Sequence, residues 1–388
     1  MHVVIVGSGV FGAWTAHHLH DRGAAVTLVD AYGPAHSRSS SGDETRIVRC
    51  GYGPDAIYSE MARRSLEQWR ELDARLDGRR AGDAVHHAEP LWHASGVLWM
   101  AAGTDAYTAA TRDTLTRLGM PPDALGPADV RDRFPQFNTD GIQVTLLERE
   151  CGVVAARRAV RALVAELEQR GVRTVSARID APETAGVRAL RANDGTDIAG
   201  DRFVFACGAW LPRLFPEALR NRIRPTRQLV AYFGTPAGDS RYRAARLPAW
   251  IDFPAGMYGT PDIDGRGIKV GIDDHGGSID PDADDRLPDA SSVQRARDWL
   301  AHRVPALGGA PVVETRVCAY ENTDTGDFII DRHPAHGNVW IVGGGSGHGF
   351  KHGPAVGELA AQMILEGVQP DARFALVRRT TDARRAVY

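Results

Sequence analysis

The chain has few cysteines, and none is spaced like a metal site or a disulfide framework. Among its 388 residues, Cys50, Cys151, Cys207 and Cys318 are widely scattered and form no C-x-x-C pair. We therefore expect neither a disulfide framework nor a bound metal. Such sparse use of cysteine is typical of a reducing compartment, so a cytoplasmic location is expected.

Long apolar runs and an excess of charge are also absent. No run approaches the roughly 18 apolar residues that span a bilayer. Met1 leads directly into a short apolar strand, so no signal peptide is expected. The net charge of −3 gives no indication of a nucleic-acid partner or of an anionic membrane surface. The length favours about two domains.

Residues 1–30 have the pattern of a dinucleotide-binding βαβ unit. An apolar strand, Val3–Val6, leads into the glycines Gly7, Gly9 and Gly12 of a G-x-G-x-x-G turn, and a helix follows. These glycines allow a tight turn, a close approach to a pyrophosphate and close packing of helix on strand. A second strand ends in Asp30, whose carboxylate suits the hydroxyls of an adenosine ribose.

The C-terminal part contains a second strand–loop–helix unit. The strand Val339–Val342 precedes the loop GGGSGHGFKHG and a helix over Pro354–Leu365. Glycines in such a loop let the backbone approach a planar ligand and present N–H donors to it. We expect the following helix to direct its positive end toward a negatively charged part of that ligand.

The pattern between these units predicts alternating helices and strands. Helices are expected over residues 58–76, 107–118, 152–169 and 292–302, and strands over 96–100, 172–175 and 203–206. Residues 227–270 are expected to be rich in strands. The segment ending at Arg49 is expected to form a loop that enters a helix.

Several motifs, taken together, resemble the monomeric sarcosine oxidase family. They are GSGVFG, GDETRIVR, GAW, IKVG, VCAYENT, DFIID and SGHGFKHGPAVGELAAQM, in the family's order over nearly the whole chain. This family includes N-methyltryptophan oxidase, pipecolate oxidase and the fructosyl amino acid oxidases. The resemblance implies a monomeric FAD enzyme that oxidises a small amine with O₂, giving an imine and hydrogen peroxide.

The expected fold class is α/β, with a Rossmann-type FAD-binding domain and a second, mixed-sheet substrate domain. We assign residues 1–83, 150–225 and 321–388 to a discontinuous FAD-binding domain. Residues 84–149 and 226–320 form the expected substrate domain.

The resemblance also implies a set of residues that hold FAD. Cys318 in VCAYENT matches the cysteine that bonds covalently to the flavin 8α-methyl group, and a thiolate is a suitable nucleophile for that bond. A small buried thiol is the alternative interpretation of Cys318. The predicted cofactor-binding residues are Gly7, Gly9, Val10, Phe11, Gly12, Asp30, Ser40, Ser41, Thr45, Arg46, Val175, Cys207, Gly208, Trp210, Cys318, Gly345, Gly347, His348, Gly349 and Lys351.

The predicted catalytic residues follow from the same resemblance. Lys269 matches the lysine that activates oxygen over the flavin, where a fixed cation stabilises developing negative charge; a lysine at a sheet edge is the alternative. Arg49 and Lys351 match the two cations that hold the substrate carboxylate. Tyr258, Tyr320 and His348 match residues that line the pocket or lie close to the flavin.

Asp273 departs from the family pattern. Sarcosine oxidase has an active-site histidine at the fourth residue after the lysine, and this chain has an aspartate there. If Asp273 faces the pocket, it can pair with a cationic or hydrogen-bonding group of the substrate. The alternative is that Asp273 points to solvent. We therefore expect a substrate other than sarcosine, such as a pipecolate-like or N-substituted amino acid with a carboxylate.

Three other functions remain open from the sequence. One is a flavin amine dehydrogenase that passes electrons to a carrier instead of O₂. The presence of Lys269 argues against this function. Another is a deglycating fructosyl amino acid oxidase. The third is a nucleotide-binding scaffold without catalysis, which would be colourless when purified.

Overall fold

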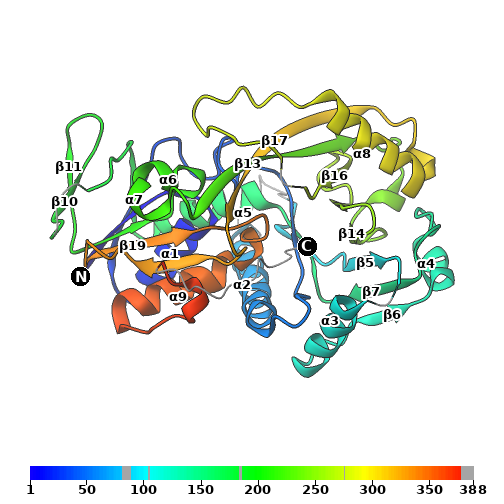
Figure 1. The fold of residues 1–388 in the computed structure, drawn as a ribbon, viewed down its shortest axis with the longest axis horizontal. Helices are drawn as coiled ribbons and strands as arrows, with labels where there is room; N and C mark the ends of the chain where they lie inside the picture. Colours follow the sequence, from blue (N-terminus) through cyan, green and yellow to red (C-terminus); the bar gives the residue numbers. More distant parts are fainter. Residues whose placement is uncertain (81–88, 104, 183–185, 275, 377–388) are drawn as a thin grey trace.

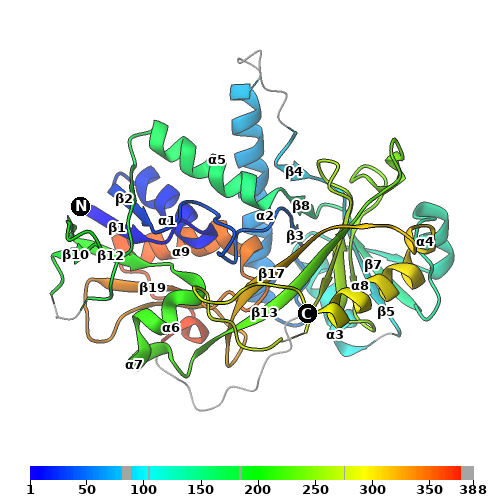
Figure 2. The same ribbon diagram turned by 90° about the horizontal axis from the view of Figure 1, so that it is seen from above.

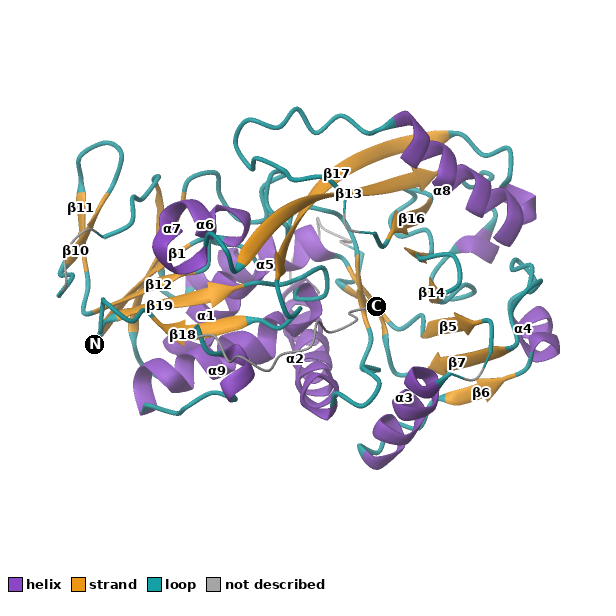
Figure 3. Cartoon of the chain, in the orientation of Figure 1, coloured by secondary structure: helices purple, strands orange, loops and turns teal. Residues whose placement is uncertain are grey.

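The computed structural model describes residues 1–388 except 81–88, 104, 183–185, 275 and 377–388 (Figure 1). In this part of the chain two large sheets lie on opposite sides of the molecule, as Figures 1 and 3 show. The fold is mixed α/β, and the predicted fold class is confirmed.

The first sheet has the parallel order expected of a dinucleotide-binding unit. Strand β1 lies centrally and pairs in parallel with β2 and β12, and β18 is the antiparallel strand at one edge. Across the sheet the strands are β18 (Ile329–Arg332), β19 (Val339–Gly343), β12 (Arg202–Phe205), β1 (His2–Val6), β2 (Ala25–Asp30) and β9 (Arg173–Ser176).

Both faces of this sheet are covered. Val3 and Ile5 of β1 pack into one apolar cluster, and Val4 and Val6 pack into another on the opposite face. This explains why β1 is apolar without alternation. The first cluster contains residues of α1 (Val10–Asp21), α2 (Ala56–Arg80), α5 (Ala156–Gln169) and α9 (Gly353–Glu366). The second contains residues of α6 (Leu211–Leu214), α7 (Pro216–Leu219) and the hairpin β10 (Ala189–Arg191) and β11 (Asp197–Ala199).

The second sheet is larger and mostly antiparallel. Two long strands, β13 and β17, run from it toward the first sheet, as Figure 2 shows from above. In order its strands are β17 (Val312–Thr323), β13 (Ile223–Phe233), β16 (Ile268–Ile272), β15 (Met257–Thr260), β14 (Ala249–Asp252), β5 (Val97–Ala101), β7 (Val144–Glu148) and β6 (Asp123–Leu125).

Alternation along these strands separates a core face from a site face. Ile268, Val270 and Ile272 of β16 pack into a cluster with Trp299 of α8 (Ala290–Arg303). Helix α4 (Pro127–Arg133) contributes to this cluster as well, and α3 (Ala106–Arg117) lies near β5. Because strand side chains alternate between faces, Lys269 is directed to the other face.

A small three-stranded sheet corrects two sequence predictions. Its strands are β3 (Arg46–Val48), β8 (Gly152–Val154) and β4 (Trp92–His93), in the order β3–β8–β4. The segment ending at Arg49 is therefore a strand and does not enter a helix, and residues 152–154 are a strand before α5 begins at Ala156. The sequence did not indicate either strand, because each is three residues long and exists through pairing with a distant partner.

Candidate active site

The turn between β1 and α1 has the geometry that its glycines require. Gly7 has φ of 103°, a left-handed value that favours glycine. A Cβ on Gly12 would lie 1.8 Å from the carbonyl oxygen of Gly7, so only glycine allows this close packing of helix on strand. Close to this turn, the Val10 N–H at the start of α1 donates to Ser41 Oγ at 3.0 Å.

A cavity of about 280 Å³ extends from this turn along the end of β2. Asp30 lies in its wall, where the carboxylate accepts N–H groups of Ser8 at 2.7 Å and Tyr32 at 2.8 Å. Ten of the predicted cofactor residues line it: Gly7, Gly9, Val10, Phe11, Asp30, Ser40, Ser41, Cys207, Gly208 and Trp210.

Glu321, which the sequence analysis missed, lies in the wall of the same cavity. It is buried, and its Oε2 atom has no hydrogen-bond partner among the residues that the structure describes. Burial raises the pKa of Glu321 to about 7. Hydrogen bonds from the backbone N–H groups of Gly345 and Gly344 act in the opposite direction and lower this pKa. Its neighbour Tyr320 lines a second cavity, so the end of β17 separates the two spaces.

The second cavity, of about 80 Å³, brings together residues from five separated parts of the chain. Nine predicted site residues line it: Arg46, Arg49, Tyr258, Lys269, Asp273, Tyr320, Gly347, His348 and Lys351. Every residue predicted as catalytic is among them.

Lys269 is held in a buried ion pair. Its Nζ donates to Asp43 Oδ2 at 2.5 Å and to the Thr45 carbonyl at 2.9 Å. Burial lowers the pKa of Lys269, and the Asp43 carboxylate opposes this effect. Strand β16 lies between β13 and β15, so Lys269 is in the sheet interior and not at an edge.

Asp43 connects several charges under the second cavity. Besides Lys269, it binds the Arg46 guanidinium, and it accepts the Tyr232 hydroxyl at 2.8 Å. Burial alone would raise the pKa of Asp43, but Lys269 and Arg46 hold it well below its ordinary value. The motif GDETR contains this aspartate, but no pattern in the sequence indicated that Asp43 belongs to the site.

Arg49 and Lys351 meet at Tyr52. The Arg49 guanidinium lies 4.5 Å from the Tyr52 ring and 5.0 Å from the Trp99 ring. Lys351 Nζ donates to the Tyr52 hydroxyl at 2.8 Å and to the His348 carbonyl at 3.0 Å. Burial lowers the pKa of Lys351, and the nearby Arg49 lowers it further. Both cations are therefore held rigidly beside one cavity.

Asp273 faces this cavity and these cations. It is half-buried, and burial raises its pKa to about 6, while Arg49 and Lys351 act to lower it. The sequence left open whether Asp273 faces the pocket or points to solvent. In the structure Asp273 lies in the cavity wall.

Aromatic side chains complete the wall. The hydroxyls of Tyr258 and Tyr320 lie 3.2 Å apart. The His348 ring stacks on Phe328 at 4.8 Å, and its Nε2 lies 3.0 Å from the Gly326 carbonyl. These contacts fix the orientation of the His348 ring.

The remaining predicted cofactor residues lie outside the lining of both cavities. Cys318 is buried in β17, where burial and Asp43 raise the pKa of its thiol while Arg46 and Lys269 lower it. Since Arg46 and Lys269 line the second cavity, Cys318 lies close to that cavity. The others are Gly12, Thr45, Val175, Gly345 and Gly349, of which Val175 lies two residues before Ala177 of the larger cavity.

A family model described as "FAD dependent oxidoreductase" matches residues 2–363. The chain belongs to this family and is an FAD-dependent oxidoreductase. It is 30% identical to monomeric sarcosine oxidase of Bacillus sp. strain B-0618, over 94% of this chain and 92% of the relative. It is 32% identical to monomeric sarcosine oxidase of Streptomyces avermitilis, over 94% of each chain.

Other comparisons agree on the fold. N-methyl-L-tryptophan oxidase of Salmonella arizonae is 28% identical over 94% of each chain. The crystal structure of L-proline dehydrogenase from P. horikoshii superposes with a TM-score of 0.82 at 20% identity, covering 97% of this chain and 96% of that one. The resemblance to the sarcosine oxidase family is thereby confirmed.

The residues present fit FAD. A Cβ on Gly9 would occupy the space beside Ser41 Oγ, 3.3 Å away, so the absence of a side chain leaves an open approach to the start of α1. Glu321 lies in the wall of the same cavity, and in the described part of the chain its Oε2 atom has no hydrogen-bond partner. Within the described residues, no helix combines the length and apolarity that crossing a bilayer requires.

Proposed function

We propose that the protein oxidises a secondary amine or cyclic imino acid that bears a carboxylate, giving an imine and hydrogen peroxide. One observation carries this proposal: two buried cations, Arg49 and Lys351, share a small cavity with the carboxylate of Asp273. The named activities of the relatives, sarcosine oxidase and N-methyl-L-tryptophan oxidase, support the same reaction class.

Arg49 and Lys351 bind the substrate carboxylate in this proposal. Arg49 is fixed between two aromatic rings, so its planar guanidinium is already oriented for a carboxylate. Lys351 has three N–H donors, and Tyr52 and the His348 carbonyl accept two of them. The third remains for a ligand in the cavity.

Asp273 binds the amine end of the substrate. As a carboxylate it accepts the N–H of a secondary amine, which a histidine in its neutral form does with one ring nitrogen only. A ring or a larger N-substituent places this N–H differently from the N-methyl group of sarcosine. We assign no side chain as a strong base.

Bound FAD would supply a two-electron acceptor for the substrate and a donor of these electrons to O₂. The residues that would hold it are the Gly9 turn, Asp30 and the loop at Gly347. Lys269 provides a fixed cation where negative charge develops on O₂, which favours an oxidase over a dehydrogenase.

We also propose that Cys318 bonds covalently to the flavin. Its proximity to Arg46 and Lys269 supports this, since both cations favour the thiolate against the effect of burial. We further propose a monomer in the cytoplasm, which agrees with the description of the relatives as monomeric and with the free cysteines. Residues 1–83, 150–225 and 321–388 remain our proposal for the FAD-binding domain.

A panel of amines tests the substrate class through peroxide release in air. The panel pairs sarcosine, N-methyltryptophan, proline and pipecolate with the corresponding amines that lack a carboxylate. We expect turnover of the carboxylate-bearing compounds only, and higher kcat/KM for a cyclic or larger amine than for sarcosine. A preference for amines without a carboxylate would overturn the proposal.

Two controls separate the parts of this proposal. A parallel assay without air, with a dye as electron acceptor, detects a dehydrogenase: turnover with the dye but none in air would refute the oxidase assignment. Asp273→His should shift the preference toward sarcosine, and Asp273→Asn, which keeps the size of the side chain, should lower kcat/KM for cyclic substrates. An unchanged preference in both variants would show that Asp273 does not select the substrate.

A further inference from the structure

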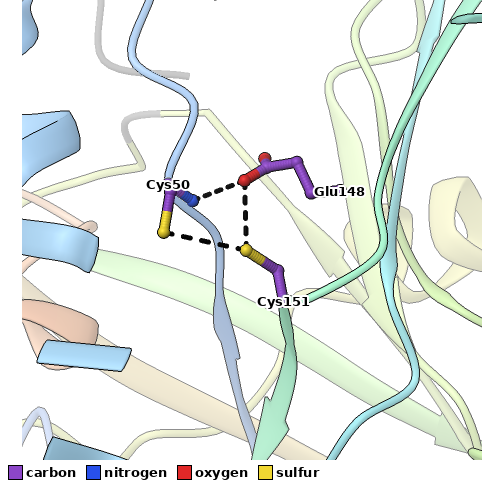
Figure 4. A group of neighbouring side chains, drawn as sticks. All are labelled: Cys50, Glu148 and Cys151. Carbon is purple, nitrogen blue, oxygen red and sulfur yellow. Dashed lines mark hydrogen bonds between the residues drawn. The ribbon is translucent and has the colours of Figure 1, made fainter. Parts of the chain in front are cut away.

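Two cysteines that are 101 residues apart in sequence have their thiols in contact beside the proposed site. Cys50 Sγ and Cys151 Sγ lie 3.7 Å apart, and both side chains are fully buried (Figure 4). They meet because β3 pairs with β8, with Val48 opposite Gly152. Cys50 follows the end of β3 and Cys151 precedes β8, so their backbones are already adjacent.

Glu148 joins this thiol pair to the proposed substrate site. Its Oε2 accepts the Cys151 thiol at 3.1 Å and the Cys50 N–H at 2.7 Å, and its Oε1 accepts Trp99 Nε1 at 2.7 Å. Trp99 packs against the Arg49 guanidinium, and Arg49 is the residue immediately before Cys50. A chemical change at the two thiols therefore affects Arg49 by two routes, through the backbone of Cys50 and through the Trp99 ring.

The Cys50, Glu148 and Cys151 side chains are close enough together to bind a metal ion. Their number and their hydrogen bonds, however, argue against a metal site. No fourth His, Cys, Asp or Glu atom joins them at this spacing among the residues that the structure describes, whereas zinc takes four ligands. Glu148 Oε2 already accepts N–H groups from Cys50 and Gly51 in addition to the thiol. The Cys151 thiol, in contrast, lies within reach of the Cys50 sulfur at 3.7 Å as well as of Glu148 Oε2 at 3.1 Å.

We propose that Cys50 and Cys151 form a reversible disulfide when hydrogen peroxide accumulates at the active site, and that this bond weakens substrate binding by Arg49. The source of peroxide rests on the proposed oxidase function. Overall, two thiols and one H₂O₂ give one disulfide and two waters. One thiolate first attacks a peroxide oxygen, giving a sulfenic acid and, after protonation, water. The second thiol then attacks the sulfenic sulfur, and the S–O bond breaks to release the second water.

The order of attack follows from the surroundings of the thiols. Burial raises the pKa of the Cys151 thiol, and its contacts with Cys50 and Glu148 raise it further. Cys151 is therefore the second thiol to react, and Cys50 attacks peroxide first.

Closing the bond moves the segment that carries Arg49. The sulfur atoms must approach from 3.7 Å to about 2.05 Å, and the Cys151 thiol must leave Glu148. This shift acts on Cys50, one residue from Arg49, so we expect KM for the carboxylate-bearing substrate to rise about tenfold on oxidation, within the range that a displacement near 1 Å costs. The kcat value should change less.

The experiment treats the flavin-loaded enzyme with added H₂O₂ and maps its cysteines by mass spectrometry of non-reduced peptides. We expect a crosslinked Cys50–Cys151 peptide two mass units lighter than the sum of the two thiol peptides, together with the rise in KM. Dithiothreitol should reverse both. In Cys151→Ser, where the hydroxyl can still donate to Glu148, basal KM should stay near wild type and peroxide should not change it.

Each other outcome contradicts the proposal. Oxidation of Cys50 to sulfinic or sulfonic acid without a crosslink would exclude the reversible disulfide, as would crosslinks to Cys207 instead. A crosslink without a change in KM would exclude its effect on Arg49. Because peroxide is added as a reagent, the crosslink is tested even if the amine panel finds no substrate; in that case binding of a carboxylate-bearing amine, measured by calorimetry, replaces KM.

Discussion

Replacing Asp43 by asparagine tests the buried charges on which the oxidase assignment depends. Asp43 is the only carboxylate that the structure records in an ion pair with Lys269, among the described residues, and it binds Arg46 as well. Asparagine keeps the size of the side chain but removes its charge, and so leaves the buried Lys269 and the half-buried Arg46 without this counterion. Removing one partner of a buried ion pair typically costs about 3–5 kcal/mol in the free energy of unfolding.

We expect this loss to lower the thermal midpoint by about 4–6 °C, at roughly 1.2 °C per kcal/mol for a chain of 388 residues. The native pKa of Asp43 lies below its ordinary value, so its contribution is present above pH 3.8 and is lost only in stronger acid. The Asp43 contribution itself is therefore constant between pH 6 and 8, so a difference from wild type that narrows as the pH rises over this range reports loss of the Lys269 proton in the variant. Denaturant titrations at both pH values measure it.

The same substitution should slow the reaction of the reduced enzyme with O₂. Without the Asp43 charge the pKa of Lys269 falls further, so less of Lys269 keeps its positive charge at neutral pH. In stopped-flow experiments reoxidation should become slower, and faster again as the pH is lowered. Tyr232→Phe is the matched control, because it removes one hydrogen bond to the same carboxylate but leaves the Asp43 charge in place, and it should cost about 1.5–3 kcal/mol.

A double-mutant cycle measures the interaction energy between Asp43 and Lys269. Lys269→Met combined with Asp43→Asn should be less destabilising than the sum of the two single changes, by about 1–3 kcal/mol. Additive effects would show that Asp43 and Lys269 do not interact. Wild-type stability together with a wild-type reoxidation rate in Asp43→Asn would refute the reasoning as a whole.

Three further predictions follow from individual side chains. Because the native pKa of Glu321 is raised from 4.5 to about 7, its burial costs about 3 kcal/mol above pH 7 and nothing below pH 4.5. Glu321→Gln should therefore stabilise flavin-free protein at pH 8 but not at pH 4.5, and parallel curves of unfolding free energy against pH would contradict this. Arg49→Met or Lys351→Met should cost about 2–5 kcal/mol in kcat/KM for a carboxylate-bearing amine and little for an analogue without the carboxylate; equal losses for both substrates would show that these cations do not bind the carboxylate. Cys318→Ser should release its flavin on acid precipitation, whereas flavin remaining in the pellet would disprove the covalent bond.

The sequence by itself determined the dinucleotide-binding unit and the family. The turn geometry of Gly7 and the close packing at Gly12 could be predicted from sequence because they depend on short spacings within one βαβ unit, and local backbone geometry is encoded locally. The apolar strands and the long helices were predicted to within a few residues for the same reason. Lys269, Arg49 and Lys351 were found through motifs of the family, and the structure then placed all three beside one cavity.

Tertiary structure alone decided which distant residues meet. The short strands β3 and β8 have no pattern of their own, yet their pairing brings Cys50 to Cys151 and fixes the segment of Arg49. Asp273 faces the cavity because of the path of the chain after β16, which no local pattern encodes.

The charge balance of the site also depends on the fold. Asp43 is one acidic residue among 49 in the chain until folding buries it against Lys269, 226 positions away. Glu321 follows Tyr320 in sequence, but alternation along β17 directs one to each cavity. Spacing in the sequence fixes short-range geometry, whereas burial and pairing between remote segments set the charges and pKa values, and these arise only when the sheets pack together.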